Sequence, residues 1–118
     1  MSKDLNGWTV VIDLDGTLVE TAPDLHAALN HVLKLDGHEE VSLETIRSMV
    51  GDGAKALIRK GLGHNRTPID ETDIETRLWP AFLDYYEANI TRHSYVFDGA
   101  LATLNRLLER GATLAICT

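Results

Sequence analysis

Residues 8–18 constrain the fold most strongly, because they join an apolar segment to two closely spaced carboxylates. Residues 10–12 (Val-Val-Ile) are typical of a buried β-strand, since β-branched side chains suit a sheet that is covered on both faces. Asp13 and Asp15 follow at i and i+2, and such positions point the same way on a strand. We therefore predict two neighbouring carboxylates at the carboxyl end of a strand, where open parallel α/β sheets bind their ligands.

The two residues that follow, Gly16 and Thr17, suit a turn at this strand end. Gly16 allows the backbone to turn sharply and to approach a ligand closely. Two adjacent carboxylates repel each other, and a cation or a shared proton relieves that repulsion. The pattern predicts a metal site, an anionic substrate that brings a metal, or both. The simpler alternative is an Asp- and Gly-containing turn without chemistry, since both residues are common in turns.

Composition narrows the class of partner. The chain has 118 residues and a formal net charge of −7, which argues against nucleic acid and against an acidic membrane surface. A phosphate substrate stays compatible, because a local metal and backbone N–H groups bind anions on an acidic protein. Cys117 is the single cysteine, so no internal disulfide forms, and we expect its thiol to be buried in an apolar strand. No signal core or membrane-length apolar run occurs, so we expect a cytoplasmic protein.

Residues 20–93 read as an all-helical segment. Pro23 suits the first turn of a helix, and Gly37 marks the expected end of that helix. Ser42 is a typical N-cap for a second helix.

The second half of this segment predicts two further helices. A third helix begins at Ala54 and is expected to end at Gly61, followed by a loop over residues 61–68. Asp70 or Thr72 opens a long helix, in which Pro80 predicts a kink or a break because proline has no backbone N–H.

After the helical segment, strand and helix patterns alternate again. Residues 94–99 carry an extended segment, residues 101–108 an amphipathic helix, and residues 112–117 a second apolar strand. The order strand, helical insertion, helix, strand predicts an α/β fold: the start of a doubly wound core, from residues 1–19 and 94–118, with a helical cap domain inserted at residues 20–93.

The segment over residues 12–18 resembles the first motif of the haloacid dehalogenase (HAD) superfamily, an apolar strand followed by Asp-x-Asp-Gly-Thr. The resemblance implies that Asp13 is the nucleophile, which becomes an aspartyl-phosphate. It implies that Asp15 is the general acid and then the general base. Magnesium (Mg²⁺) would be held by the Asp13 carboxylate and by the backbone carbonyl of Asp15.

Within the superfamily the chain is most similar to phosphoglycolate phosphatases and their relatives with a helical cap. The loop of Gly51, Asp52, Gly53 and Ala54 resembles the cap loop that selects the substrate, although a plain interhelical turn is the alternative reading. Gly16, Thr17 and the terminal Thr118 would help to bind the phosphate group.

The resemblance implies a magnesium-dependent phosphatase for a small phosphate monoester, with 2-phosphoglycolate as first choice. Asp15 argues against the dehalogenase and phosphonatase branches, which lack an acid there. Two alternatives stay open. One is a sugar-phosphate mutase of the same superfamily, and the other is a non-catalytic helical interaction module.

The family's third motif, a lysine, and its fourth, an acidic pair, belong to later strands that this sequence does not contain. We therefore interpret the chain as truncated and expect it to be inactive or very weakly active. Two strands without the rest of the sheet leave open edges and uncovered apolar faces. We therefore expect the helical segment to fold, and the remainder of the core to be marginal or shielded by self-association.

Overall fold

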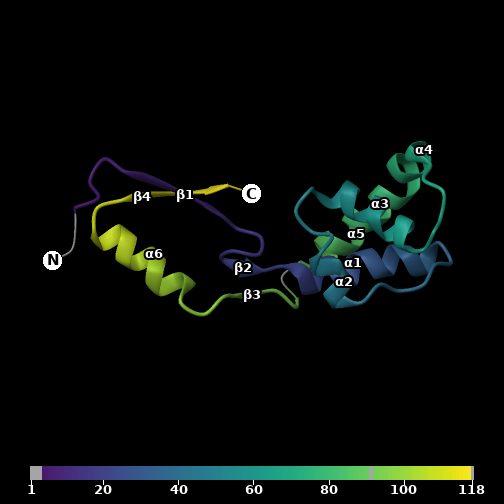
Figure 1. The fold of residues 1–118 in the computed structure, drawn as a ribbon, viewed down its shortest axis with the longest axis horizontal. Helices are drawn as coiled ribbons and strands as arrows, with labels where there is room; N and C mark the ends of the chain where they lie inside the picture. The colour runs from purple at the N-terminus through teal and green to yellow at the C-terminus, as the bar shows by residue number, and fades with distance from the viewer. Residues whose placement is uncertain (1–3, 91, 118) are drawn as a thin grey trace. The chain divides into compact units, whose positions relative to one another are not determined.

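The structure is a computed structural model that describes residues 4–90 and 92–117 (Figure 1). The chain divides into two compact units. The first, here called the strand unit, comprises Met1–Glu20 and Tyr95–Thr118, and the second, the helical unit, comprises Thr21–Ser94. The sequence places the corresponding boundaries after residues 19 and 93.

The strand unit is built on two parallel strands, β1 (Thr9–Asp13) and β4 (Thr113–Cys117). Their register runs from Thr9 opposite Thr113 to Asp13 opposite Cys117. Helix α6 (Ala100–Glu109) precedes β4 and contacts it. A short antiparallel pair, β2 (Val19–Glu20) and β3 (Tyr95–Val96), completes the unit. The strand–helix–strand pattern predicted from the sequence is present.

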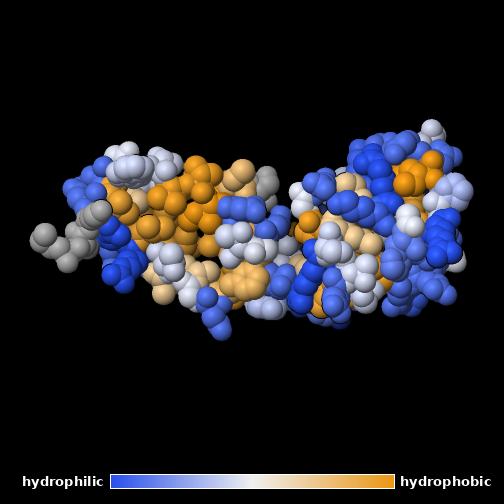
Figure 2. Space-filling view, in the orientation of Figure 1, coloured by the Kyte–Doolittle hydropathy of each residue, from blue (hydrophilic) through white to orange (hydrophobic). Residues whose placement is uncertain are grey.

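The uncovered apolar faces expected of a core with only two strands are present, whereas the buried strand that residues 10–12 alone indicate is not. Val11 in β1 is 63% exposed and Ile116 in β4 is 50% exposed, and Cys117, which we expected to be buried, is exposed as well. Figure 2 shows apolar side chains gathered at the surface over β1 and β4. The physical reason is that a two-stranded sheet in contact with one helix retains an uncovered face and unpaired edges.

The helical unit begins with α1 (Ala22–Leu35), which carries Pro23 at its start and is followed by Gly37 at a φ of 78°. The second helix, α2 (Leu43–Arg47), is capped by Ser42, whose hydroxyl oxygen accepts a hydrogen bond from the Thr45 N–H group at 3.2 Å. Both predicted helix starts are confirmed.

Helix α3 (Ala54–His64) continues three residues beyond the predicted end at Gly61. Gly61 is buried inside this helix, where it lies against Leu29 of α1. The prediction was wrong because close packing between two helices outweighs the low helix propensity of one glycine.

A break precedes Pro80, as predicted. Asp70 caps α4 (Glu71–Asp73), a π-helical turn η1 (Ile74–Leu78) follows, and α5 (Trp79–Asn89) carries Pro80 in its first turn. The N–H group of Trp79 donates to the Ile74 carbonyl, five residues back. Because Pro80 has no N–H group to donate four residues back, the helix widens by one residue at this point.

The hydrophobic core lies in the helical unit. Its buried residues come from α1, α2, α3, η1, α5 and the segment before α2: Ala28, Leu29, Val32, Leu33, Val41, Ile46, Leu57, Ile58, Leu62, Ile74, Leu78 and Phe82. Phe82 is the largest of the fully buried side chains. Burial of this apolar surface is the main source of stability for the unit.

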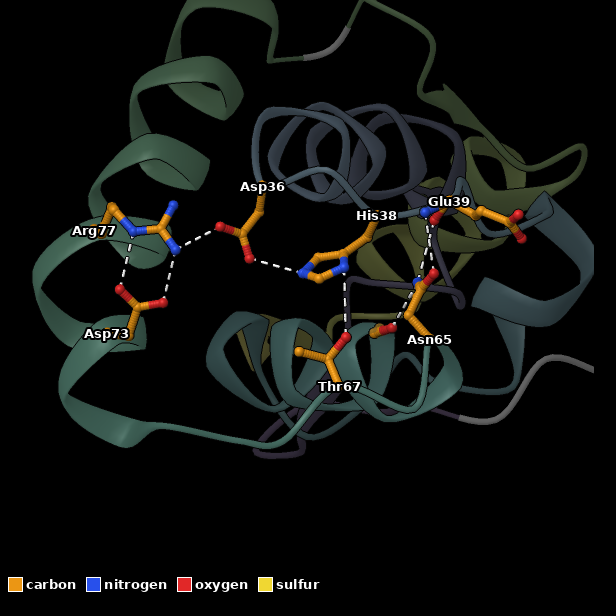
Figure 3. A network of polar contacts seen from close by, with 8 residues as sticks. Asp36, His38, Glu39, Asn65, Thr67, Asp73 and Arg77 are labelled. Carbon is orange, nitrogen blue, oxygen red and sulfur yellow. Dashed lines mark hydrogen bonds and ion pairs between the residues drawn. The ribbon is translucent and has the colours of Figure 1, made fainter.

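A polar network joins the end of α1 to η1 (Figure 3). Asp36 accepts from Arg77 Nη2 at 2.5 Å, and its other oxygen lies 2.7 Å from His38 Nε2. His38 Nδ1 lies 3.4 Å from the Thr67 hydroxyl. Arg77 also donates to Asp73, and this hydrogen bond holds the pKa of Asp73 below its usual value and raises the pKa of Arg77.

Candidate active site

Asp13 is the last residue of β1 and lies opposite Cys117 of β4. Its side chain is exposed at the carboxyl end of the parallel pair. The next residue, Leu14, donates its N–H group to the Cys117 carbonyl at 3.3 Å, so the pairing with β4 extends just past Asp13. The backbone on both sides of Asp13 is thus held by the neighbouring strand.

The loop after β1 folds back on one carbonyl group. The Leu14 carbonyl accepts from the N–H groups of residues 17–19, at 3.3, 3.0 and 3.1 Å. Gly16 donates to the Val19 carbonyl at 2.9 Å and has a φ of 75°, in the left-handed region that glycine occupies without strain. The loop is therefore a compact turn specified by its own backbone hydrogen bonds.

This turn presents Asp15, Gly16 and Thr17 to solvent. Among the residues that the structure describes, the Asp13 and Asp15 carboxylates and the Asp15 carbonyl make no hydrogen bond. These groups are oxygen donors of the kind that Mg²⁺ prefers. The first motif thus places these oxygen atoms on one short segment at the strand end.

No group of three or more His, Cys, Asp or Glu side chains is placed to hold a metal within residues 4–90 and 92–117. The protein ligands available to a metal at this strand end are the oxygen atoms of Asp13 and Asp15. Two such donors fit magnesium, because this ion commonly keeps several waters and shares its remaining positions with substrate phosphate.

The predicted substrate loop, residues 51–54, belongs to the helical unit. Gly51 and Gly53 both have positive φ, and Gly53 is the N-cap of α3. Asp52 is exposed and accepts from Lys60 Nζ at 2.8 Å, and Lys60 also donates to the Met49 carbonyl at 3.1 Å. Lys60 holds the pKa of Asp52 below its usual value.

Ala54 is the first residue of α3, directly after the glycine loop. Thr118, the predicted phosphate ligand, lies outside the described residues. The anchoring of Asp52 by Lys60 was missed by the sequence reasoning, because a pair eight residues apart across a loop has no periodic signature.

The comparisons with known proteins decide the family. The sequence model of the haloacid dehalogenase-like hydrolases matches residues 10–118. This chain belongs to that family. The HAD-like fold class predicted from the sequence is confirmed by a crystal structure described as a predicted phosphoglycolate phosphatase from Haemophilus somnus, with a TM-score of 0.86 at 26% identity. That match covers 99% of this chain and 53% of the other.

Curated relatives in the family are similar along nearly the whole chain. A phosphoglycolate phosphatase of Caulobacter vibrioides is 42% identical over 115 residues, covering 98% of this chain and 48% of the relative. One from Agrobacterium fabrum is 37% identical over 108 residues, covering 92% and 46%. The HAD-like chain thus spans about half the length of the curated relatives it matches. No helix in its described part is long and apolar enough to cross a membrane.

Proposed function

We propose that this protein is a magnesium-dependent phosphatase that hydrolyses a small phosphate monoester, with 2-phosphoglycolate as the first candidate. The observation that carries the proposal is the exposed Asp13 at the end of β1, followed by Asp15 in a hydrogen-bonded turn. The names of the relatives from Caulobacter and Agrobacterium support the choice of substrate.

In the first step an oxygen of the Asp13 carboxylate forms a bond to phosphorus, and the bond from phosphorus to the ester oxygen breaks. Asp15, as the carboxylic acid, gives its proton to that leaving oxygen, which departs as an alcohol. The exposed positions of both side chains leave room for a substrate phosphate.

In the second step a water molecule attacks the phosphorus of the aspartyl-phosphate. The Asp15 carboxylate takes the proton of this water, and the bond between phosphorus and Asp13 breaks to release inorganic phosphate. The Asp13 carboxylate and the Asp15 carbonyl are the groups that would hold magnesium. When bound, the ion neutralises negative charge on the phosphoryl oxygens.

The remaining predicted residues have binding roles in this proposal. Gly16, Thr17 and Thr118 contribute to the phosphate site. The helical unit acts as a cap, in which the loop of residues 51–54 contacts the organic part of the substrate. Its two positive-φ glycines and the Lys60 contact with Asp52 support a loop of defined shape. The partner is then a small phosphorylated metabolite.

The test is magnesium-dependent phosphate release from 2-phosphoglycolate at neutral pH, with and without a chelator. The variants are Asp13→Asn and, as a matched control, Asp98→Asn, which removes another exposed carboxylate of the strand unit. We expect any release by the 118-residue chain to be very slow, because catalysis of phosphoryl transfer depends on positioning and charge stabilisation. The release should persist in Asp98→Asn and disappear in Asp13→Asn.

A binding readout covers the case in which turnover is too slow to detect. Magnesium with inorganic phosphate should shift the amide resonances of Gly16 and Thr17 in the wild-type chain, and Asp13→Asn should abolish the shifts. The proposal would be contradicted if the wild-type chain showed no phosphate release and no resonance shifts. It would also be contradicted if Asp13→Asn released phosphate as fast as the wild type. A panel that includes hexose phosphates tests the mutase alternative.

The non-catalytic interaction module is a second candidate, and the distribution of the core favours it. The clustered core lies in the helical unit, whereas the strand unit exposes large apolar residues. Under this alternative, magnesium and phosphate leave the melting temperature unchanged, because only a ligand that binds the folded state raises stability.

A further inference from the structure

Asp24, in the first turn of α1, is a buried carboxylate that the proposed chemistry does not use. Its side chain accepts hydrogen bonds from the N–H groups of His93 and Ser94, both at 2.9 Å, and from the Ser94 hydroxyl. Only 3% of Asp24 is exposed. These bonds join positions 69 and 70 residues apart, at the beginning and the end of the helical unit.

Burial of a carboxylate is costly unless hydrogen bonds replace its hydration. Here both oxygens of Asp24 are used, one by His93 and the other by Ser94. Hydrogen bonds to an ionised acceptor are stronger than those between neutral groups. Asp24 therefore specifies where residues 93 and 94 lie against the start of α1.

These two residues lead directly into β3. Tyr95, next in the chain, pairs with Glu20, and Val96 pairs with Val19. A ladder of two residue pairs is too short to be stable alone, and its register is weakly specified unless something outside it fixes one strand. The fixed position of Ser94 provides that constraint.

The β2–β3 ladder in turn holds the loop that carries the first motif. Phe97 donates its N–H group to the Leu18 carbonyl at 3.0 Å. Gly16 donates to Val19 of β2 at 2.9 Å, and Leu18 and Val19 both donate to the Leu14 carbonyl. A continuous series of backbone hydrogen bonds thus extends from β3 to the turn around Asp15.

We propose that Asp24 is a positioning residue for the turn over residues 14–18. By holding Ser94 it sets the register of β2 against β3, and that register determines where the Leu18 and Val19 backbone lies. The coupling passes along the chain through the peptide bond between Ser94 and Tyr95. The catalytic meaning of the inference rests on the proposed function, while the coupling itself does not.

The test is amide hydrogen exchange, read by NMR, on the full 118-residue chain. In Asp24→Asn, the new side chain keeps one acceptor oxygen and turns an NH₂ group toward an N–H donor, so at least one of the hydrogen bonds is lost. We expect exchange at His93, Ser94, Phe97 and Gly16 to accelerate by about tenfold or more. The amide resonances of Gly16 and Thr17 should shift.

Asp84→Asn is the matched control, because the Asp84 side chain is an exposed carboxylate of the same unit and makes no hydrogen bond among the described residues. It should leave exchange at Phe97 and Gly16 unchanged. Ser94→Ala removes only the hydroxyl donor and should accelerate exchange at the same two amides to a smaller extent. If Asp24→Asn does not fold, Ser94→Ala decides the question.

Exchange at Phe97 and Gly16 that equals the wild-type value, or that rises only as much as exchange in the core of α1, would overturn the inference. The second of these results means that Asp24 stabilises the chain as a whole without positioning the turn. The readout needs no turnover, so a failed phosphate-release assay would count against the proposed function and leave this test intact.

Discussion

Gly61 in α3 packs against Leu29 in α1 so closely that a Cβ atom at position 61 would lie 3.0 Å from Leu29 Cδ1 and 3.2 Å from Leu29 Cδ2. Leu29 is completely buried, with core neighbours around it. Its side chain therefore has little room to move away. A methyl group at position 61 would therefore force the Leu29 side chain to shift by a few tenths of an ångström.

Gly61→Ala should destabilise the helical unit by about 1–3 kcal/mol, the usual cost of an added methyl group in a packed core. Gly63→Ala, two residues later on the exposed side of α3 with open space around it, should stabilise by about 0.5–1 kcal/mol through helix propensity. Urea unfolding followed by circular dichroism measures both. A Gly61→Ala variant as stable as the wild type would show that Leu29 can repack freely.

Asn30→Ala should lower stability by about 1–3 kcal/mol. Asn30 is buried and makes two hydrogen bonds to Val41: its Oδ1 accepts from the N–H group at 2.7 Å and its Nδ2 donates to the carbonyl at 2.9 Å. Removal of the amide leaves the buried Val41 N–H group without its partner, whereas the Val41 carbonyl keeps His26 Nε2 at 2.8 Å. Asn105→Ala, at an exposed position in α6, is the control and should change the urea midpoint little. Equal midpoints for the two variants would contradict this expectation.

Acidification should weaken the helical unit through Asp73. The pKa of this carboxyl is lower in the folded chain than its ordinary value, because Arg77 donates to it. The stabilisation is therefore present above the ordinary pKa of about 4 and is lost as the pH falls through the lower folded value. An NMR titration of the Asp73 carboxyl should show this low pKa.

Arg77→Gln should move the pKa of Asp73 back toward its ordinary value and reduce the loss of stability in acid. High salt should have a similar but weaker effect, because both side chains are partly exposed. Arg106→Gln, at an exposed residue of α6, should leave the titration unchanged. An Asp73 pKa that does not respond to Arg77→Gln would show that the ion pair is not formed in solution.

Exposed apolar residues of the strand unit should drive self-association. Val11, Ile116 and Leu101 are all at least half exposed, and β1 and β4 have unpaired edges. Light scattering at rising concentration should give masses above the 13.0 kDa of one chain. Val11→Lys should lower the measured mass, and Ile69→Lys, at an exposed isoleucine of the helical unit, should not. A clean monomer with a single cooperative melt would show that this prediction is wrong.

Several features of the fold could be predicted because their causes are local. Ser42 and Asp70 cap helices with their own side chains, a few residues from the N–H groups they bind. Pro80 disturbs the helix at its own position. The exposed turn after β1 follows from an apolar strand, two aspartates and a glycine that adopts a positive φ.

The predictions that were wrong or missed concern residues whose contacts lie far away in the sequence. The continuation of α3 through Gly61 depends on Leu29, 32 positions earlier, and the exposure of Cys117 depends on which elements cover the sheet. The role of Asp24 also escaped prediction, because first-turn acids usually complement the helix dipole at the surface. Nothing near Asp24 in the sequence points to His93 and Ser94.

The sequence by itself thus determined the starts of α1, α2 and α3, the break before Pro80, and the placement of Asp13 and Asp15 at a strand end. Those features depend on backbone geometry and hydrogen bonds within a few residues. Only the tertiary structure decided how closely Gly61 approaches Leu29, which apolar side chains are buried, and that the Asp24 carboxylate holds Ser94. Each of these features depends on segments that come into contact only after the chain folds. The free energy of each contact then depends on how far the side chains are buried.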